Sequence, residues 1–375
     1  MMISLCLALA LPKVIVAHYM PWYQAKPFHS DWGWHWTMNH FNPDAGKIAS
    51  QFHPVIGPYD SQDPDVIEYQ LLTMKLAGID GVFIDWYGID DLWDYPFIHK
   101  ASQMVFEETK KLGMKFGVVY EDQTLKYLIE NKVVKTEDAV ADGRRAMRWL
   151  ETNWFSGKNY LRIEGKPALL VFGPQYYQDG DWSKMLSGID VSFFTLHHRR
   201  ANAIGGYDWP LPQGGNEGCE KERLAFLDRT KSWPVHIAGA YPRFVDIYKE
   251  AGVHGSWGTV TDDDGKTYRH TLSEALQGSA PVVQIATWND WGEGTVIEPS
   301  KEFGYRDLEA TQSLRKQYVE PAFHFTADDL RLPEKLFRRR KEAKADRETL
   351  DRVAALLAQG QCERARKLLN ISIGT

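Results

Sequence analysis

The sequence predicts an α/β fold, a TIM (β/α)8 barrel with a C-terminal helical extension, and three observations carry this prediction. Short β-branched runs alternate with segments of helical periodicity, as in proteins built on a parallel sheet. The runs are almost continuously apolar, which is typical of strands buried on both faces. No G-x-G-x-x-G turn follows any run, so a doubly wound nucleotide-binding sheet is the weaker alternative.

The expected elements follow one another from the first strand to a closing helix. The first long helix begins after the N-cap candidate Asp63, has a proline at its first position and ends at Gly78. The expected helices are residues 64–77, 97–112, 137–151 and 305–318. The expected strands are residues 13–18, 81–85, 114–120, 167–172, 191–196, 235–240, 256–260 and 281–287.

Composition divides the chain into three parts. The apolar residues 1–12 are interpreted either as the remnant of a signal sequence or as a lead-in to the first strand. Residues 13–325 form the barrel, which is the expected catalytic domain. Residues 326–375 form a helical extension, with a charge-rich start and two short amphipathic helices joined at Gly360. Acidic residues interrupt its basic run, which favours a solvated appendage over a nucleic-acid site.

Charge and cysteine content exclude several classes of function. The chain has 44 Lys and Arg against 50 Asp and Glu, a net charge of −6, so we expect no nucleic-acid partner. We expect no transmembrane segment, because no apolar run is long enough to cross a bilayer. Three dispersed cysteines and unpatterned histidines match no metal motif, so we expect no metal and no cofactor. The signal-like start favours a periplasmic or extracellular location, with a cytoplasmic one as the alternative.

Aromatic and polar residues concentrate where the expected strands end. The chain has 14 Trp, 17 Tyr and 17 Phe, many of them beside His, Asp and Asn. Active sites of TIM barrels lie at the carboxyl ends of the strands. Aromatic faces match the C–H face of a sugar ring, and carboxylates, amides and imidazoles bind hydroxyl groups, so we expect an oligo- or polysaccharide partner. The expected substrate-binding residues are His18, Tyr19, Trp22, Tyr23, His35, Asp85, Trp86, Tyr87, Tyr120, Glu121, Asp122, His197, Trp288, Asn289 and Trp291.

The strongest local signal is Asp290-x-x-Glu293, which lies between tryptophans and glycines just past the last strand. Burial beside tryptophans raises the pKa of a carboxyl group, as a general acid near neutral pH requires. We therefore expect both residues to be catalytic. The alternative is that Asp290 caps the next turn and Glu293 is merely exposed. Glu121 and Asp122 are neighbours, so at most one of them enters the site while the strand continues.

Several motifs resemble glycoside hydrolase family 99, the endo-α-mannosidases and endo-α-mannanases. They are HYMPWY at 18–23 with WHW at 34–36, GPYDSQDP at 57–64 and TWNDWGEGT at 287–295. The resemblance runs from about residue 13 to 320. The chain departs from the family at Asp290, where family 99 has Glu. The form W-N-D-x-G-E is also similar to family 71, the α-1,3-glucanases.

The resemblance implies a metal-independent TIM barrel that cleaves α-glycosidic bonds in a mannan-like or related polysaccharide. It implies that Glu293 is the acid/base and that Asp290 is the second carboxylate, which assists the sugar 2-hydroxyl. A retaining and an inverting reaction both stay open, because the separation of the two carboxyl groups decides between them. The alternatives are a non-hydrolytic carbohydrate-binding or polysaccharide-biosynthesis-associated barrel, and a metal-dependent hydrolase that uses the histidines.

Overall fold

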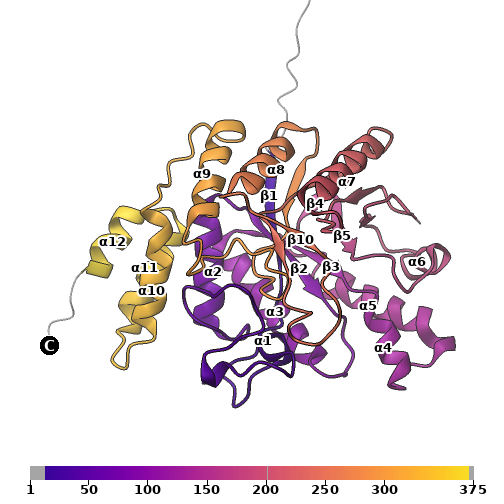
Figure 1. Ribbon diagram of the computed structural model, residues 1–375, viewed down its shortest axis with the longest axis horizontal. Helices are drawn as coiled ribbons and strands as arrows, with labels where there is room; N and C mark the ends of the chain where they lie inside the picture. The colour runs from indigo at the N-terminus through magenta and orange to yellow at the C-terminus, as the bar shows by residue number, and fades with distance from the viewer. Residues whose placement is uncertain (1–12, 201, 371–375) are drawn as a thin grey trace, which may run out of the picture.

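The computed structural model describes residues 13–200 and 202–370 and shows a closed barrel of 8 parallel strands, the TIM-barrel fold that the sequence predicts (Figure 1). Around the barrel the order is β3, β2, β1, β11, β8, β7, β6, β5, and Val118 pairs with Leu169 where β3 meets β5 and closes it. The barrel strands are β1 Val14–Tyr19, β2 Gly81–Trp86, β3 Lys115–Tyr120, β5 Lys166–Val171, β6 Ser192–Leu196, β7 Gly205–Tyr207, β8 Ile237–Ala240 and β11 Val282–Ile285.

Helices surround the barrel, and local capping sets the bounds of the first long one. In α2 the Asp63 side chain accepts a hydrogen bond from the amide of Asp65 at 3.0 Å, and Gly78 ends the helix at φ 85°. The helices are α1 Trp34–Thr37, α2 Pro64–Ala77, α3 Tyr95–Leu112, α4 Thr124–Glu130, α5 Ala139–Asn153, α6 Asp179–Met185, α7 Gly215–Thr230, α8 Lys266–Gln277, α9 Arg306–Tyr318, α10 Leu332–Arg340, α11 Arg347–Ala358 and α12 Cys362–Asn370. Short 3-10 turns lie at Pro43–Ala45, Thr136–Asp138 and Asp329–Arg331.

The expected strand at residues 256–260 is not part of the barrel, and this expectation was wrong. Its last residues form β10 Thr259–Val260, which pairs antiparallel with β9 Phe244–Val245. The missing barrel strand is β7, whose sequence Gly-Gly-Tyr carries no β-branched residue. A Cβ at Gly205 would lie 1.9 Å from the carbonyl oxygen of Val235, so close backbone packing excludes the residues that usually signal a strand. Arg162–Ile163, β4, forms a hairpin with β5 outside the barrel ring.

Strand residues alternate between two packed layers. Inside the barrel, Val16, Phe83 and Val119 belong to one apolar cluster. Their neighbours Ala17 and Ile84 belong to a second cluster, between the barrel wall and the helices. Because successive side chains of a strand point to opposite faces, this register decides which strand-end residues face the barrel axis.

The extension packs on the outside of the barrel, where α10, α11 and α12 lie together beside α2 (Figure 1). Arg340 is buried and its Nε lies 2.7 Å from Glu68 Oε1 on α2, and Lys341 Nζ lies 2.6 Å from Asp63 Oδ2. No helix in residues 13–200 or 202–370 is long and apolar enough to cross a membrane. The expected N-terminal segment, residues 1–12, lies outside the described residues.

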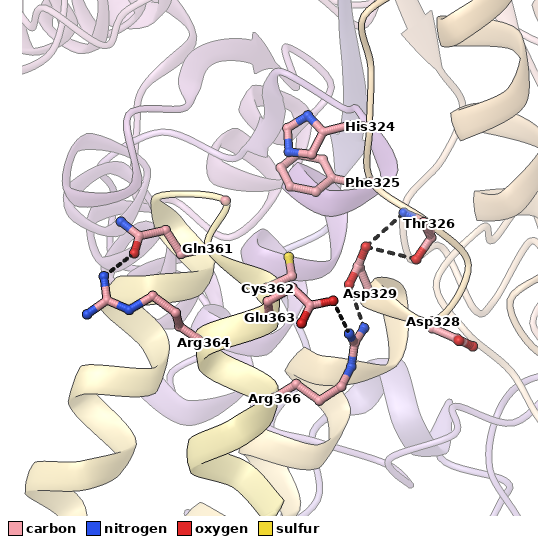
Figure 2. Close-up of a pocket in the computed structure, with 11 residues that line it drawn as sticks. His324, Phe325, Thr326, Asp328, Asp329, Gln361, Cys362, Glu363, Arg364 and Arg366 are labelled. Atoms are coloured by element: carbon pink, nitrogen blue, oxygen red, sulfur yellow. Dashed lines mark hydrogen bonds and ion pairs between the residues drawn. The ribbon is translucent and has the colours of Figure 1, made fainter.

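The start of α12 and the segment after residue 323 enclose a cavity of about 460 Å³ (Figure 2). An ion pair of 2.7 Å between Arg366 Nη2 and Asp329 Oδ1 joins its two walls. Burial raises the pKa of the Cys362 thiol to about 12, so this cysteine is not a thiolate at neutral pH. We therefore interpret the residues around this cavity as a structural contact that joins α12 to the segment after residue 323.

Candidate active site

The segment after β11 folds into a tight turn that presents the Asp290-x-x-Glu293 pair. Asp290 Oδ1 accepts a hydrogen bond of 3.0 Å from the Glu293 amide, and the Asp290 carbonyl accepts one of 2.9 Å from Gly294. The Asp290 amide donates to Thr287 Oγ1 at 2.8 Å. Asp290 thus does cap the turn. It is also 4% exposed, which a simple surface cap does not require.

Four carboxyl groups from three barrel strands share this end of the barrel. Asp85 is the next-to-last residue of β2 and faces the barrel axis, Glu121 follows β3, and Asp290 and Glu293 follow β11. Burial, and then the charge of Asp290, raise the pKa of Asp85 well above its usual value. Burial, and then the Asp85 carboxylate, do the same for Glu121. These mutual effects place the carboxyl groups within electrostatic reach of one another.

The pKa values of both catalytic candidates are raised. Burial raises the pKa of Asp290 to about 7, although the amides of Glu293 and Gly292 oppose the rise. Burial, followed by the charges of Asp290, Asp246 and Asp85, raises the pKa of Glu293 well above its usual value. No ion pair involving Asp85, Glu121, Asp290 or Glu293 occurs within residues 13–200 and 202–370. This set of four carboxyl side chains can therefore store a proton and give it to a bound molecule.

Several buried polar atoms beside the carboxyl groups have no hydrogen-bond partner in the described part of the chain. They include His18 Nδ1, Trp22 Nε1 and Asp85 Oδ1. Burial lowers the pKa of His18 to about 3, so its ring is neutral. Buried polar groups are nearly always paired in folded proteins. Unpaired ones at a strand end are suited to a ligand rich in hydroxyl groups.

A hydrogen-bond network beneath the turn holds it in place. The Tyr59 hydroxyl accepts from Asn289 Nδ2 at 3.0 Å and from Trp291 Nε1 at 3.1 Å, and it donates to Glu298 Oε2 at 2.8 Å. Asn289 also bonds both backbone groups of Met20. Asn289 and Trp291 are fully buried, so they anchor the turn to β1 rather than line its surface. Tyr23 is buried as well, and its hydroxyl donates to the Asn289 carbonyl at 2.9 Å.

A half-buried aromatic group lies beside this network. The rings of Trp22 and His35 stack with centroids 4.2 Å apart and planes 7° apart, and Tyr87 meets Trp22 at 6.1 Å. His35 Nε2 lies 3.4 Å from Asp94 Oδ2, which orients the ring. Trp22, His35 and Tyr87 are thus partly accessible in the segments after β1 and β2, where the sequence predicts substrate contacts.

Other expected substrate-binding residues lie away from the barrel mouth. Tyr19, Trp86, Tyr120 and Trp288 are buried in the layer between the barrel wall and the helices. Trp86, for example, donates to His99 Nδ1 at 3.1 Å. The alternation along the strand explains this for Tyr19, Trp86 and Tyr120, because each of them follows an inward-facing position by one. Trp288 lies beyond the end of β11 and turns outward outside that alternation. We do not propose them as sugar contacts.

Asp122 has a position that differs from the expected one, whereas His197 lies directly after β6, where the sequence places it. Asp122 is buried and accepts from the Gln175 amide at 2.9 Å, so it holds the segment after β5. Its neighbour Glu121 instead lies with Asp85 and Glu293. Neighbouring side chains of an extended chain point to opposite faces, so only one of the two enters the site. His197 is half-buried, and its Nδ1 lies 3.8 Å from Asp208 Oδ1 after β7.

Two residues of the site were not among those predicted. The Val245 amide donates to the Glu293 carbonyl at 2.8 Å, and the Ile247 amide donates to the Gly292 carbonyl at 3.0 Å. This pairing brings Asp246 and Tyr248 to the turn. A Cβ at Gly292 would lie 3.5 Å from Asp290 Oδ1 and 3.9 Å from the Tyr248 hydroxyl, so that glycine leaves room between them. No periodicity in the sequence marks this loop-to-loop pairing.

One three-residue group with metal-binding side chains lies between α7 and α8, in the described chain, apart from the carboxyl groups. It consists of Glu220, His270 and Glu274. Arg223 lies 2.7 Å from Glu220 Oε1 and also pairs with Glu274. The guanidinium already neutralises both glutamates, so this group is poorly suited to a cation.

Comparisons with known proteins agree with the motifs. A family model described as "Glycosyltransferase WbsX" matches residues 254–311. A glycoprotein endo-alpha-1,2-mannosidase-like protein of Danio rerio is 24% identical over 315 residues, covering 76% of this chain and 65% of the relative. The glycoprotein endo-alpha-1,2-mannosidase of Rattus norvegicus is 23% identical, with 75% and 67% covered. The chain thus spans about two thirds of the length of these relatives. Uncharacterized protein WxcX of Xanthomonas campestris is 20% identical, with 82% and 50% covered.

The fold has solved relatives. The GH99 endo-alpha-mannosidase from Bacteroides thetaiotaomicron superposes with a TM-score of 0.61 at 19% identity, covering 82% of this chain and 97% of that one. The chain resembles glycoside hydrolase family 99. This resemblance, predicted from three separate motifs, is confirmed by the relatives, and the structural likeness shows a shared fold.

Proposed function

We propose that this family 99-like protein is a glycoside hydrolase that cleaves α-mannosidic bonds in an oligo- or polysaccharide, with Glu293 and Asp290 as its catalytic pair. The observation that carries the proposal is the buried group of carboxyl side chains, which has raised pKa values and no cationic partner among the described residues. The names of the curated relatives support α-mannosyl glycans as the substrate class.

The proposed chemistry uses the two carboxyl groups without a metal. Glu293, kept protonated by burial, gives its proton to the glycosidic oxygen as the bond to the anomeric carbon breaks. Asp290 acts as the second carboxylate and accepts a proton from the sugar 2-hydroxyl or from water. If the 2-hydroxyl gave the proton, its oxygen closes onto the anomeric carbon; water then adds its hydroxyl to that carbon, its other proton goes to Glu293, and Asp290 returns its proton to the 2-oxygen. If water gave the proton, its hydroxyl adds directly to the anomeric carbon, and the proton held by Asp290 returns to Glu293 through solvent. The net reaction consumes one water per bond cleaved.

Replacing the acid tests this assignment. Glu293→Gln keeps the shape of the side chain but has no proton to give, so kcat on yeast α-mannan falls by ~10²–10⁴. Glu217→Gln, on the exposed start of α7, is the matched control and retains activity. Near-full activity of the Glu293 variant on a poor leaving group overturns the assignment.

A second candidate is a barrel that binds or transfers sugars during polysaccharide biosynthesis. It is favoured by the "Glycosyltransferase WbsX" family model, whose match includes Asp290 and Glu293, and by Asp in place of the family 99 Glu. Calorimetric binding of mannose oligosaccharides without product release over a long incubation favours this candidate over hydrolysis.

We also propose that the protein degrades its polysaccharide in the periplasm or outside the cell. The apolar residues 1–12, interpreted as the remnant of a signal sequence, support this location. Fractionation of the cells that make the protein tests it, and recovery in the cytoplasm alone contradicts it.

A further inference from the structure

Large aromatic side chains remain exposed in the loops around the proposed catalytic pair. Trp257 is 50% exposed, Trp34 39% and Trp93 64%. Scattered exposed apolar residues are ordinary on protein surfaces. Trp257 and Trp34 differ from that background, because ring contacts connect each of them to the active end of the barrel.

The first aromatic row starts at the catalytic turn and ends at Trp257. Tyr248, whose hydroxyl lies beside Gly292, meets the His254 ring at 4.5 Å, and His254 meets Trp257 at 4.8 Å. The tip of the row is held in position. The Trp257 amide and the Ser256 hydroxyl both donate to Asp246 Oδ2 at 2.8 Å.

Asp246 links this tip to the carboxyl group. It is 8% exposed, and its charge contributes to the raised pKa of Glu293. Its Oδ1 is buried with no partner in the described chain. A rigid exposed ring loses little conformational entropy when a ligand packs against it.

The second row leaves the turn in the other direction. Trp22 stacks on His35, and His35 meets Trp34 edge-on at 5.0 Å. Asp94, which pairs with His35, lies beside the exposed Trp93. This row belongs to segments after β1 and β2, whereas the first belongs to the segment after β8.

The strand order separates the two rows. β11, which carries Asp290 and Glu293 at its end, lies between β1 and β8 in the barrel. A chain of sugar units that crosses the carboxyl pair would therefore meet the Trp34 row on one side and the Trp257 row on the other.

We propose that Trp257 and Trp34 are outer sugar-binding platforms on opposite sides of the scissile bond, each of which binds a sugar unit that is not itself cleaved. The inference rests on the proposed function and adds two specificity-determining side chains to its site. Each platform supplies a flat apolar face for the C–H face of one sugar ring.

Substrate length is the decisive variable. With α-mannose oligosaccharides of two to six units, Trp257→Ala lowers kcat/KM on the hexasaccharide by ~10-fold and lowers it much less on the disaccharide. Trp257→Phe restores most of the loss because it keeps a ring. Val253→Ala, on the same loop and 40% exposed, is the control and changes kcat/KM at no length. Equal losses at every length, or no loss at all, overturn the inference.

A binding measurement separates this inference from the proposed function. If the wild-type protein cleaves no mannan, the proposed hydrolysis fails. Calorimetry of the hexasaccharide with wild type and Trp257→Ala then still tests the platform, and equal affinity of the two proteins overturns it.

Discussion

The carboxyl end of the barrel and the contact between α2 and the extension use acidic side chains in opposite ways. At the extension, hydrogen bonds from Arg347 and Lys341 outweigh burial and hold the pKa of Asp65 below its usual value. At the barrel end, Asp290 is buried without a cation and its pKa rises to about 7. Pairing keeps an acid ionised and joins two parts of the chain, whereas unpaired burial costs stability and leaves a proton to donate.

The largest expected effect separates the two roles of Asp290. Asp290→Asn keeps an oxygen that accepts from the Glu293 amide, so the turn and the melting temperature are preserved. The amide cannot accept a proton, and kcat on mannose oligosaccharides falls by ~10²–10⁴. A fully active variant would show that Asp290 only caps the turn.

A smaller effect is expected at the extension, where the comparison predicts a change in stability alone. Arg340→Ala leaves Glu68 without its partner and lowers the free energy of unfolding by about 3 kcal/mol, measured by denaturant titration. Lys335→Ala on the exposed face of α10 is the control, with a change of at most ~0.5 kcal/mol. The value of kcat stays the same in both, and a loss of kcat in Arg340→Ala would contradict the separation of the two regions.

The smallest effect is a pH dependence of stability at Glu298, which supports the turn from Asp290 to Glu293 through Tyr59. Burial raises the pKa of Glu298 to about 8, so between its unfolded value and 8 the folded protein holds a proton that the unfolded chain has lost. Its contribution to stability is complete below pH ~4.5 and is lost as the pH rises through 8.

Glu298→Gln cannot titrate and lacks this slope. The stability of the variant relative to wild type therefore grows by about 1.4 kcal/mol per pH unit over that range. Thermal melts of both proteins from pH 5 to 9 measure this difference in stability. Asp122 and Asp290 titrate in both proteins, so their contributions cancel in the difference. Parallel stability curves would show that Glu298 has an ordinary pKa in the folded protein.

Much of the fold is predictable because its signals are local. Asp63, Pro64 and Gly78 set the bounds of α2 through capping and left-handed backbone geometry alone. β7 shows the limit of such signals: Gly205 is required by the backbone of Val235, a residue 30 positions away. The same limit applies to Trp86. Its aromatic character predicts a sugar contact, but the register of β2 directs its side chain outward, into the layer between the barrel strands and the helices.

The sequence by itself determined the alternating strands and helices, the aromatic and acidic strand ends, and the Asp290-x-x-Glu293 turn, because each depends on residues close together in the chain. Only the tertiary structure decided that Tyr248 and Asp246 join that turn, that Tyr59 and Glu298 hold it from beneath, and that Tyr19 and Trp288 turn away. Those outcomes depend on which backbone segments meet across the barrel, and the burial that shifts each pKa exists only once they have met.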